Sequence, residues 1–154
     1  MFTNLDPASL GIDLPLDVLI SLASRHRFAG IDLPLEQVAA LPDLGALEVA
    51  MQEAELRFGG FAVPLDFRRD QATCERGMEQ LESWLPSARR LGCGRAYTAV
   101  VPGHDELDYR ANFDFHVERL SPLATLLARY GISLGLEFIG PQTLRDTFRH
   151  AFIY

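Results

Sequence analysis

The chain alternates short apolar runs with longer segments in which apolar residues recur at helical spacing. The apolar runs lie at 8–12, 28–33, 57–63, 95–101 and 133–139, and all but the first are closed by proline or by Gly-Pro. Such runs between turn residues are typical of buried strands, and the spacing between them predicts helices. A strand–helix unit that recurs in this way predicts a parallel sheet with right-handed crossovers.

Helix ends carry recognisable signals. Asp13, Asp43 and Asp70 each precede a helical stripe and are suitable N-caps, Asn112 opens the last helix, and Gly131 suits its C-terminal end. The predicted inner face of the long helix after Asp70 consists of Cys74, Met78, Leu81 and Leu85. The predicted inner face of the last helix consists of Phe113, Val117, Leu120, Ala124 and Leu127.

Proline and glycine interrupt three of these elements. Pro86 lies inside the long helix and is expected to kink it or split it in two, and Pro122 is expected to bend the last helix. The third apolar run contains Gly59 and Gly60. Adjacent glycines in a strand indicate a bulge or the close approach of a backbone or a ligand.

The order of elements therefore predicts a single domain over residues 1–154, with four strand–helix units and a fifth parallel strand. No Gly-x-Gly-x-x-Gly motif follows the first strand, which removes the strongest indication of a dinucleotide-binding fold. A partial (β/α)8 TIM barrel remains. Because a complete barrel needs about 250 residues, we expect a truncated one.

Composition excludes several functions. The formal net charge is −7 and the sequence pI is about 5.0, which argues against nucleic acid and anionic membranes as partners. All 14 basic residues are arginine, so Schiff-base and P-loop lysines are excluded. No apolar run approaches the roughly 20 residues of a membrane span.

Cysteine usage and the N-terminus favour a cytoplasmic location. Cys74 and Cys93 are far apart and do not form a disulfide framework, which is typical of a reducing compartment. The first residues have neither a basic region nor an apolar core, so we expect no signal peptide.

Glu137 is the leading candidate for chemistry, because it is set within the apolar run 133–139. A buried glutamate is rare unless it is paired or holds a metal. It lies toward the C-terminal end of its predicted strand, where α/β proteins build their sites. The alternative is a structural ion pair with an arginine of a neighbouring strand.

Other polar residues follow or lie within the predicted strands. Asp32 either faces the barrel mouth and touches substrate hydroxyls, or caps the following turn. Asp66 and Arg68 either line the mouth, where Arg68 suits a phosphate or carboxylate, or form a surface ion pair. Tyr97 and Thr98 are adjacent on one strand, so their side chains point to opposite faces and at most one of them faces a site in the barrel interior.

The histidines are scattered along the chain. Three of them are expected at the surface: His26 at a helix end, His104 in a polar loop and His116 on a helix. His150 follows the fifth strand together with Arg145, and both can reach a phosphorylated substrate from there. The alternative for His150 is a structural role.

Three segments carry a family resemblance: Phe-Ala-Gly-Ile-Asp-Leu at 28–33, Leu-Gly-Cys at 91–93, and Tyr-Gly-Ile-Ser-Leu-Gly-Leu-Glu-Phe-Ile-Gly at 130–140. In these segments the chain resembles the sugar phosphate isomerase/epimerase group of the xylose isomerase-like TIM barrels. The resemblance runs along essentially the whole chain and covers the N-terminal part of that barrel, roughly five of its eight strands.

The resemblance implies a divalent metal (Mn, Mg, Zn or Co) at the C-terminal mouth of the barrel, held by two Glu, one Asp and one His. The first of these ligands matches Glu137, and the other three belong to later strands that this sequence does not include. The implied substrate is a sugar or polyol. The metal would polarise its carbonyl and hydroxyl groups, and a nearby carboxylate such as Glu137 would move a proton.

Without its later ligands such an enzyme is incomplete or inactive, which leaves a second, non-catalytic interpretation. An open parallel sheet has two exposed edges, and a partial barrel exposes an apolar interior. On this interpretation the chain is a barrel fragment that self-associates as a homo-oligomer or pairs with a complementary chain.

Overall fold

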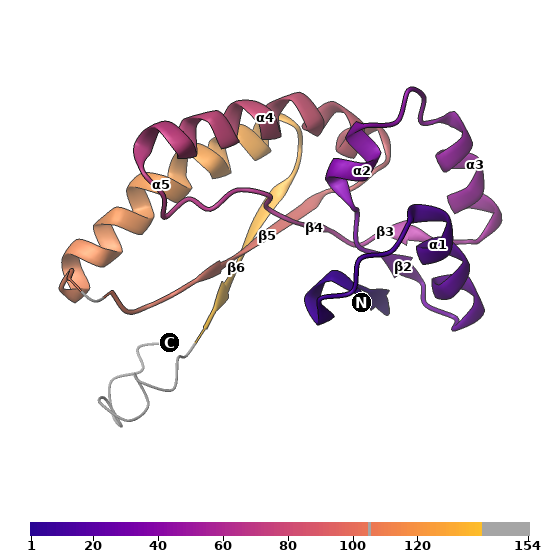
Figure 1. The fold of residues 1–154 in the computed structure, drawn as a ribbon, viewed down its shortest axis with the longest axis horizontal. Helices are drawn as coiled ribbons and strands as arrows, with labels where there is room; N and C mark the ends of the chain where they lie inside the picture. The colour runs from indigo at the N-terminus through magenta and orange to yellow at the C-terminus, as the bar shows by residue number, and fades with distance from the viewer. Residues whose placement is uncertain (105, 140–154) are drawn as a thin grey trace.

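The computed structural model describes residues 1–104 and 106–139, and its framework is a set of short parallel strands (Figure 1). The strands are β1 (Asn4–Leu5), β2 (Gly30–Ile31), β3 (Arg57–Phe58), β4 (Phe61–Ala62), β5 (Arg95–Val100) and β6 (Ser133–Phe138). The helices are the 3-10 helix η1 (Ala8–Leu10), α1 (Leu16–Arg25), α2 (Leu35–Ala39), α3 (Gly45–Glu53), α4 (Gln71–Arg90) and α5 (Tyr109–Arg129).

The strands form two three-stranded sheets, β1-β2-β3 and β4-β5-β6, which are joined where β3 leads into β4. Only Gly59 and Gly60 separate these two strands, and both glycines bond to the segment around β2. The Gly59 amide donates to the Ile31 carbonyl at 2.9 Å, and the Leu33 amide donates to the Gly60 carbonyl at 2.8 Å. The predicted third strand, 57–63, therefore pairs first with β2 and then with β5. Five parallel positions result, as the sequence predicted.

The helices cover the outer face of this framework. In Figure 1, α4 and α5 lie together on one side of β4, β5 and β6, and α1, α2 and α3 surround β1, β2 and β3. Apolar side chains of alternate strand residues pack beneath them: Ile31, Phe61 and Ala96 are at most 1% exposed. Among the described helices, none is both long enough and apolar enough to cross a membrane.

The N-cap of the long helix is confirmed. Asp70 accepts hydrogen bonds from the Thr73 amide at 3.0 Å and the Thr73 hydroxyl at 2.7 Å. The last helix begins earlier than predicted, because Asp108 accepts a bond from the Ala111 amide at 2.8 Å and acts as its cap in place of Asn112. Asp13 and Asp43 make no capping bonds, and α1 and α3 follow Pro15 and Leu44.

The structure differs from the predicted elements in three further places. The first strand lies at β1, whereas 8–12 begins as the helix η1, because the Asp6 side chain and carbonyl bond the Ser9 amide and hydroxyl. Pro86 does not split its helix, because α4 runs through it, and α5 likewise runs through Pro122; both prolines are exposed, and the kink at Pro86 and the bend at Pro122 stay predictions. The short helix α2 had no predicted counterpart.

The inner face of α5 differs from the predicted stripe in both halves: in the second half, Ala124 is exposed and Leu123 is buried in its place. Leu120 and Leu127 are buried as expected, but Phe113 and Val117 are 51% and 48% exposed. Asn112 and His116 face inward in their place, so His116 is not a surface residue. Its ring packs edge-on against Phe67 with 5.5 Å between ring centroids, and its Nδ1 lies 2.8 Å from the Asn112 carbonyl. Aromatic packing places a polar side chain where an apolar one was expected.

Gly131 ends α5 as predicted, with a left-handed φ of 71°. A Cβ there would meet no atom within 4 Å, so backbone strain is the main cost of a substitution. We expect Gly131→Ala to lower the free energy of unfolding by roughly 1 kcal/mol, measured by urea denaturation. Gly131→Asn is the matched control, because asparagine tolerates this conformation better. Equal losses in the two variants would contradict the assignment.

Candidate functional site

The face of the sheet opposite the helices carries a row of polar side chains. In the parallel ladders, Ala62 pairs with Tyr97, Tyr97 with Gly135, and Ala99 with Glu137. Paired residues point to the same face, and side chains on one face recur every second residue. Tyr97 and Glu137 therefore share the inner face, with Glu137 one step nearer the C-terminal ends of the strands.

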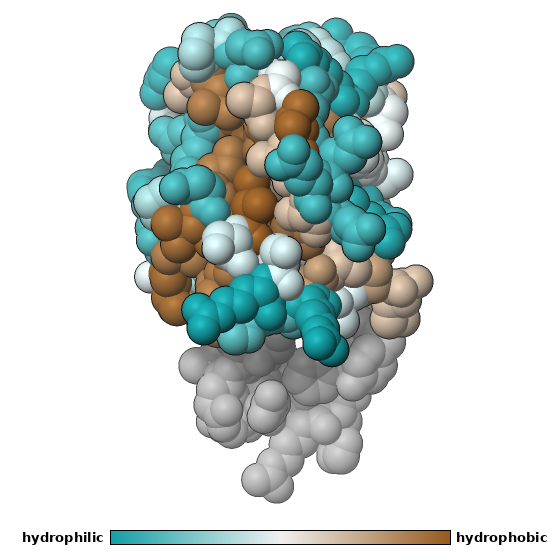
Figure 2. Space-filling model, turned by 90° about the vertical axis from the view of Figure 1, so that its right-hand side faces the viewer, coloured by the Kyte–Doolittle hydropathy of each residue, from teal (hydrophilic) through white to brown (hydrophobic). Residues whose placement is uncertain are grey.

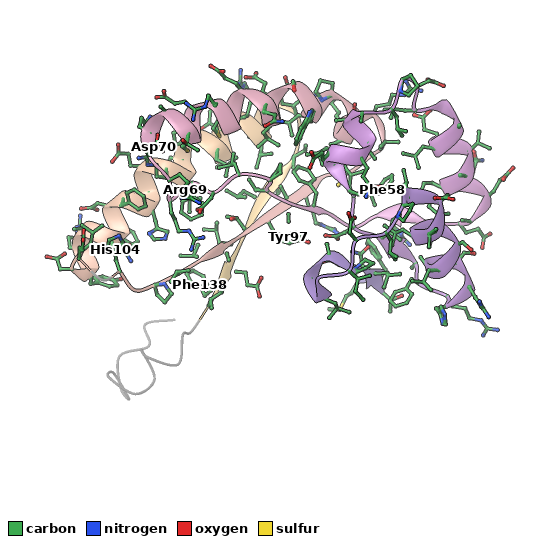
Figure 3. The ribbon with its side chains drawn as sticks, viewed as in Figure 1. Phe58, Arg69, Asp70, Tyr97, His104 and Phe138 are labelled. Carbon is green, nitrogen blue, oxygen red and sulfur yellow. The ribbon has the colours of Figure 1, made fainter. Side chains whose placement is uncertain are left out.

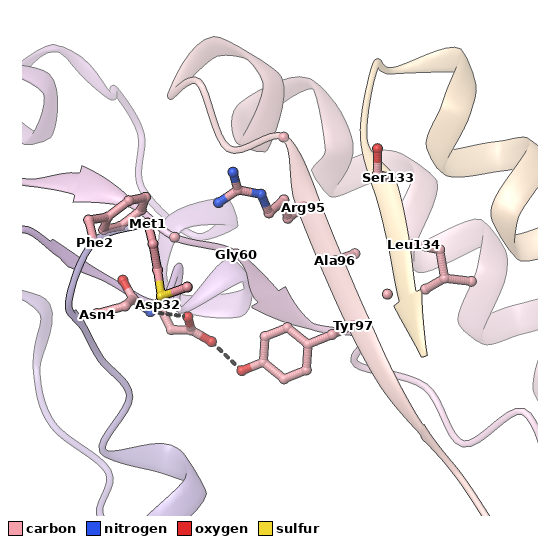
Figure 4. A pocket seen from close by; sticks show the side chains of 13 residues that line it. Met1, Phe2, Asn4, Asp32, Gly60, Arg95, Ala96, Tyr97, Ser133 and Leu134 are labelled. Carbon is pink, nitrogen blue, oxygen red and sulfur yellow. Dashed lines mark hydrogen bonds between the residues drawn. The ribbon is translucent and has the colours of Figure 1, made fainter. Parts of the chain in front are cut away.

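Four residues from three strand positions form a hydrogen-bonded cluster on this face, and we call it the inner-face cluster. Its members are Asn4 on β1, Asp6 after β1, Asp32 after β2 and Tyr97 on β5. The Tyr97 hydroxyl donates to Asp32 Oδ2 and lies 3.3 Å from Asp6 Oδ2. The Asn4 side-chain amide donates to Asp32 Oδ1 at 2.6 Å (Figure 4). The cluster ties together segments that are remote in sequence.

Two glycines make room for Asn4. A Cβ on Gly59 would lie 2.4 Å from Asn4 Oδ1, and a Cβ on Gly30 would lie 3.0 Å from the same oxygen and 2.6 Å from the Arg57 carbonyl oxygen. A backbone neighbour, as predicted, lies at Gly60, where a Cβ would be 3.3 Å from the Arg95 carbonyl oxygen, whereas the neighbour at Gly59 is the Asn4 side chain.

A cavity of about 610 Å³ opens beside the inner-face cluster (Figure 4). Asn4, Asp32 and Tyr97 line it together with Arg95 and Ser133, and several glycines leave its walls without side chains. This volume falls within the range of small-molecule pockets, roughly 300–1,000 Å³. Hydroxyl, carboxyl and guanidinium groups facing one space are able to bind a polar ligand.

The surroundings shift two pKa values in the cluster. Burial raises the pKa of Asp32; the hydrogen bond from Tyr97 opposes this shift, the charge of Asp6 adds to it, and the bond from Asn4 opposes it. Burial also raises the pKa of Tyr97, and the adjacent Asp32 raises it further. Tyr97 is therefore a hydrogen-bond donor at any ordinary pH, and Asp32 keeps its proton to a higher pH than a free aspartate.

Glu137 is not the buried residue that its apolar run predicted. It is exposed, as are its strand neighbours Leu136 and Phe138, at 45% and 78%. The reason is that Glu137 lies on the inner face, opposite the helices, and among the described residues β6 pairs only with β5, so no further strand helps to enclose that face. The ion pair weighed as its structural alternative is also not found among the described residues.

Asp66 and Arg68 lie in the loop after β4. Arg68 Nε is 2.9 Å from Asp66 Oδ1, both side chains are exposed, and the hydrogen bond from Arg68 lowers the pKa of Asp66. The surface ion pair is therefore present. The two residues also line a second hollow of about 460 Å³ together with Thr98 and Ile139.

The other predicted residues lie apart from the cluster or outside the described part of the chain. Figure 3 places Tyr97 over the middle of the sheet and His104 at the far end of the segment that follows β5. His104 is exposed, and its Nδ1 accepts bonds from the amides of Glu106 and Leu107 at 3.0 and 3.1 Å. Arg145 and His150 lie outside the described residues.

A metal centre is not complete within residues 1–104 and 106–139, where no group of three or more His, Cys, Asp or Glu side chains is placed to hold an ion. Glu137 is one carboxylate, whereas divalent cations need several oxygen or nitrogen ligands. The described residues alone therefore do not fit the metal that the family resemblance implies.

Sequence reasoning identified Asp32 and Tyr97 but missed Asp6 and Asn4. A signal for them was present: Asn4-Leu5-Asp6-Pro7 alternates polar and apolar residues and is stopped by proline. The Gly-Ile-Asp-Leu-Pro segment at 30–34 has the same form. The two aspartates occupy equivalent places after neighbouring parallel strands, since Asn4 pairs with Gly30 and Leu5 with Ile31.

No protein-family model matches the sequence, and no curated protein matches it significantly. Solved structures do match. A xylose isomerase domain protein from Alicyclobacillus acidocaldarius has a TM-score of 0.76 and 24% identity over 94% of this chain and 52% of that one. The IolI protein with a bound zinc atom has a TM-score of 0.74 and 16% identity over 91% of this chain and 52% of that one. The 3-keto-D-glucoside 4-epimerase YcjR from E. coli has a TM-score of 0.65 and 14% identity over 88% of this chain and 54% of that one.

The chain spans about half the length of these solved structures. At these identities the likeness establishes the fold. It agrees with the two parallel sheets and their covering helices, and it confirms the predicted partial (β/α)8 barrel.

Proposed function

We propose, from the fold that the chain shares with part of the xylose isomerase-like TIM barrels, that it contributes to a divalent-metal-dependent isomerase or epimerase of a sugar or related polyol. The observation that carries this proposal is the placement of Asp32, Tyr97 and Glu137 on one inner face of a partial barrel, where Asp32 and Tyr97 line a cavity of about 610 Å³. Neighbours in structure include an epimerase of a sugar derivative and a protein with a bound zinc atom.

The proposed roles follow from chemistry and position. Glu137 would be one metal ligand and would also move a proton, and the metal when bound would polarise a carbonyl or hydroxyl oxygen of the substrate. Asp32 and Tyr97 would bind substrate hydroxyls. Arg68, paired with Asp66, would bind an anionic group at the mouth.

Two further residues and the location complete this proposal. Arg145 and His150 would also bind a phosphate group, and the remaining metal ligands would come from outside the described residues. Cys74 and Cys93 are both free and buried, which supports a reducing compartment such as the cytoplasm.

Calorimetric titration with Mn²⁺ or Mg²⁺ tests the metal role. The proposal requires that Glu137, together with ligands from outside the described residues, binds the ion, and Glu137→Gln should then weaken binding at least about tenfold, because the amide lacks the charge that a hard cation prefers. Glu118→Gln, which changes an exposed glutamate on the outer helix α5, is the matched control and should bind like wild type. Absence of binding by the wild-type chain would contradict the enzymatic proposal for this chain.

The exposed inner face favours a second candidate, a barrel fragment that associates with another copy of itself. Ala62, Gly135 and Glu137 on this face are exposed, and so is Phe138 at the end of β6. Figure 2 shows further apolar side chains in a band between hydrophilic flanks on the side of α1 and α3. Sedimentation should then show a dimer or larger species. A monomer at high concentration would rule this candidate out.

A further inference from the structure

The Tyr97 hydroxyl lies between two carboxylates, although it has one hydrogen to donate. Asp32 Oδ2 and Asp6 Oδ2, which is 3.3 Å away, both lie within hydrogen-bond distance of the phenolic oxygen. Asp32 Oδ1 is already bonded to the Asn4 amide. If both aspartates were ionised, one of them would face a lone pair of the phenolic oxygen. One additional proton removes this conflict.

The charges around the cluster do not neutralise the pair. Within residues 1–104 and 106–139, neither Asp6 nor Asp32 forms an ion pair. Arg95 and Met1 line the adjacent cavity, and Arg57 stacks on Phe2 with its guanidinium carbon 4.3 Å from the ring centroid. The Cys93 thiol, whose pKa is raised to about 11 by burial, stays neutral.

We propose that Asp6, Tyr97 and Asp32 share one additional proton, so that the two carboxyl groups carry a single negative charge between them. The Tyr97 hydroxyl lies between Asp6 Oδ2 and Asp32 Oδ2 and links the two carboxyl groups, and Asn4 donates to Asp32 Oδ1. Like charges that converge on one site do not both ionise in the same pH range. The raised pKa of Asp32, to which the charge of Asp6 contributes, agrees with this arrangement.

The arrangement moves a proton without any other reactant. When the Asp6 O–H bond breaks and its proton passes to the phenolic oxygen, the Tyr97 proton passes to Asp32 Oδ2. The pair keeps one negative charge, which moves from Asp32 to Asp6. Asp32 lines the cavity and Asp6 does not line it, so Asp32 alternates between acceptor and donor toward a ligand in the cavity. Under the proposed function, on which this last step rests, the ligand group is a hydroxyl or carbonyl oxygen of a polyol, and Asp6 is a positioning residue.

A carboxyl NMR titration of the full chain labelled with ¹³C at aspartate tests the shared proton. In wild type we expect one carboxyl of the pair to titrate above the usual aspartate range. Asp6→Asn should lower that midpoint because it removes a like charge, and Tyr97→Phe should raise it because the ionised Asp32 loses a donor. Asp17→Asn, an exposed residue of α1, should leave it unchanged.

Two results would overturn the proposal: both aspartates titrating within or below the usual range in wild type, or an Asp32 midpoint that Asp6→Asn does not move. The wild-type titration decides the matter even if a variant fails to fold. It needs neither metal nor sugar, so failure to bind Mn²⁺ would contradict the proposed function and leave the shared proton standing.

Discussion

Replacing Phe61 by alanine is expected to lower the free energy of unfolding by about 3–5 kcal/mol, the usual cost of deleting a large buried aromatic side chain. Phe61 is 1% exposed and lies on β4, directly after the two glycines that join the sheets. It pairs in register with Ala96, and both side chains point toward the helices that cover β4 and β5. The cavity left by its ring would therefore open beneath the helices at the junction of the two sheets.

Urea denaturation followed by circular dichroism measures this loss. Phe113→Ala is the matched control, because the same side chain is 51% exposed on α5, and surface substitutions usually change stability by less than about 0.5 kcal/mol. A similar loss in both variants would mean that Phe61 does not occupy the core position described.

Local sequence signals predicted the elements whose cause is local. Asp70 caps its helix through Thr73, three residues away, and Gly131 supplies a left-handed residue after α5. The apolar run at 95–101 became β5. Each of these outcomes depends on residues within one or two turns, so composition and spacing were sufficient.

Burial was predicted less well, because it depends on what other segments cover. The run that contains Glu137 is as apolar as a core strand, yet β6 is mostly exposed: Leu134 packs against the core, whereas Leu136 and Phe138 are 45% and 78% exposed. On α5, packing against Phe67 turned His116 inward and left Phe113 at the surface. Neither neighbour can be identified from periodicity alone.

The candidate site was predicted in part for the same reason. Asp32 and Tyr97 follow or lie within strands that the sequence indicated, so their place near the barrel interior could be expected. Their contact with each other spans 65 positions, and the contact of Tyr97 with Asp6 spans 91. Asp6 and Asn4 enter the site only through the pairing of β1 with β2, and the true first strand was placed too late in the chain.

Replacing Gly59 by alanine is expected to destabilise the fold by roughly 1–3 kcal/mol, as for other overpacked positions. The added Cβ would lie 2.4 to 2.7 Å from three side-chain atoms of Asn4. Asn4 has little freedom to move aside, because its amide is bonded to Asp32 at 2.6 Å and its Oδ1 is already close to Gly30. The clash would therefore displace Asn4 and break its bond to Asp32.

Two further variants separate this clash from a general intolerance of alanine. Gly94→Ala should cost much less, since a Cβ there would have its nearest neighbour 3.9 Å away. Combining Gly59→Ala with Asn4→Ala removes the atoms that collide, so the double variant should be more stable than the sum of the two single losses predicts. Strictly additive losses in urea denaturation would show that Asn4 does not lie against Gly59. The close packing of Asn4 on Gly59 and Gly30 holds the Asn4 amide toward the Asp32 carboxylate. Without that packing, the inner-face cluster would lack the contact that orients Asp32.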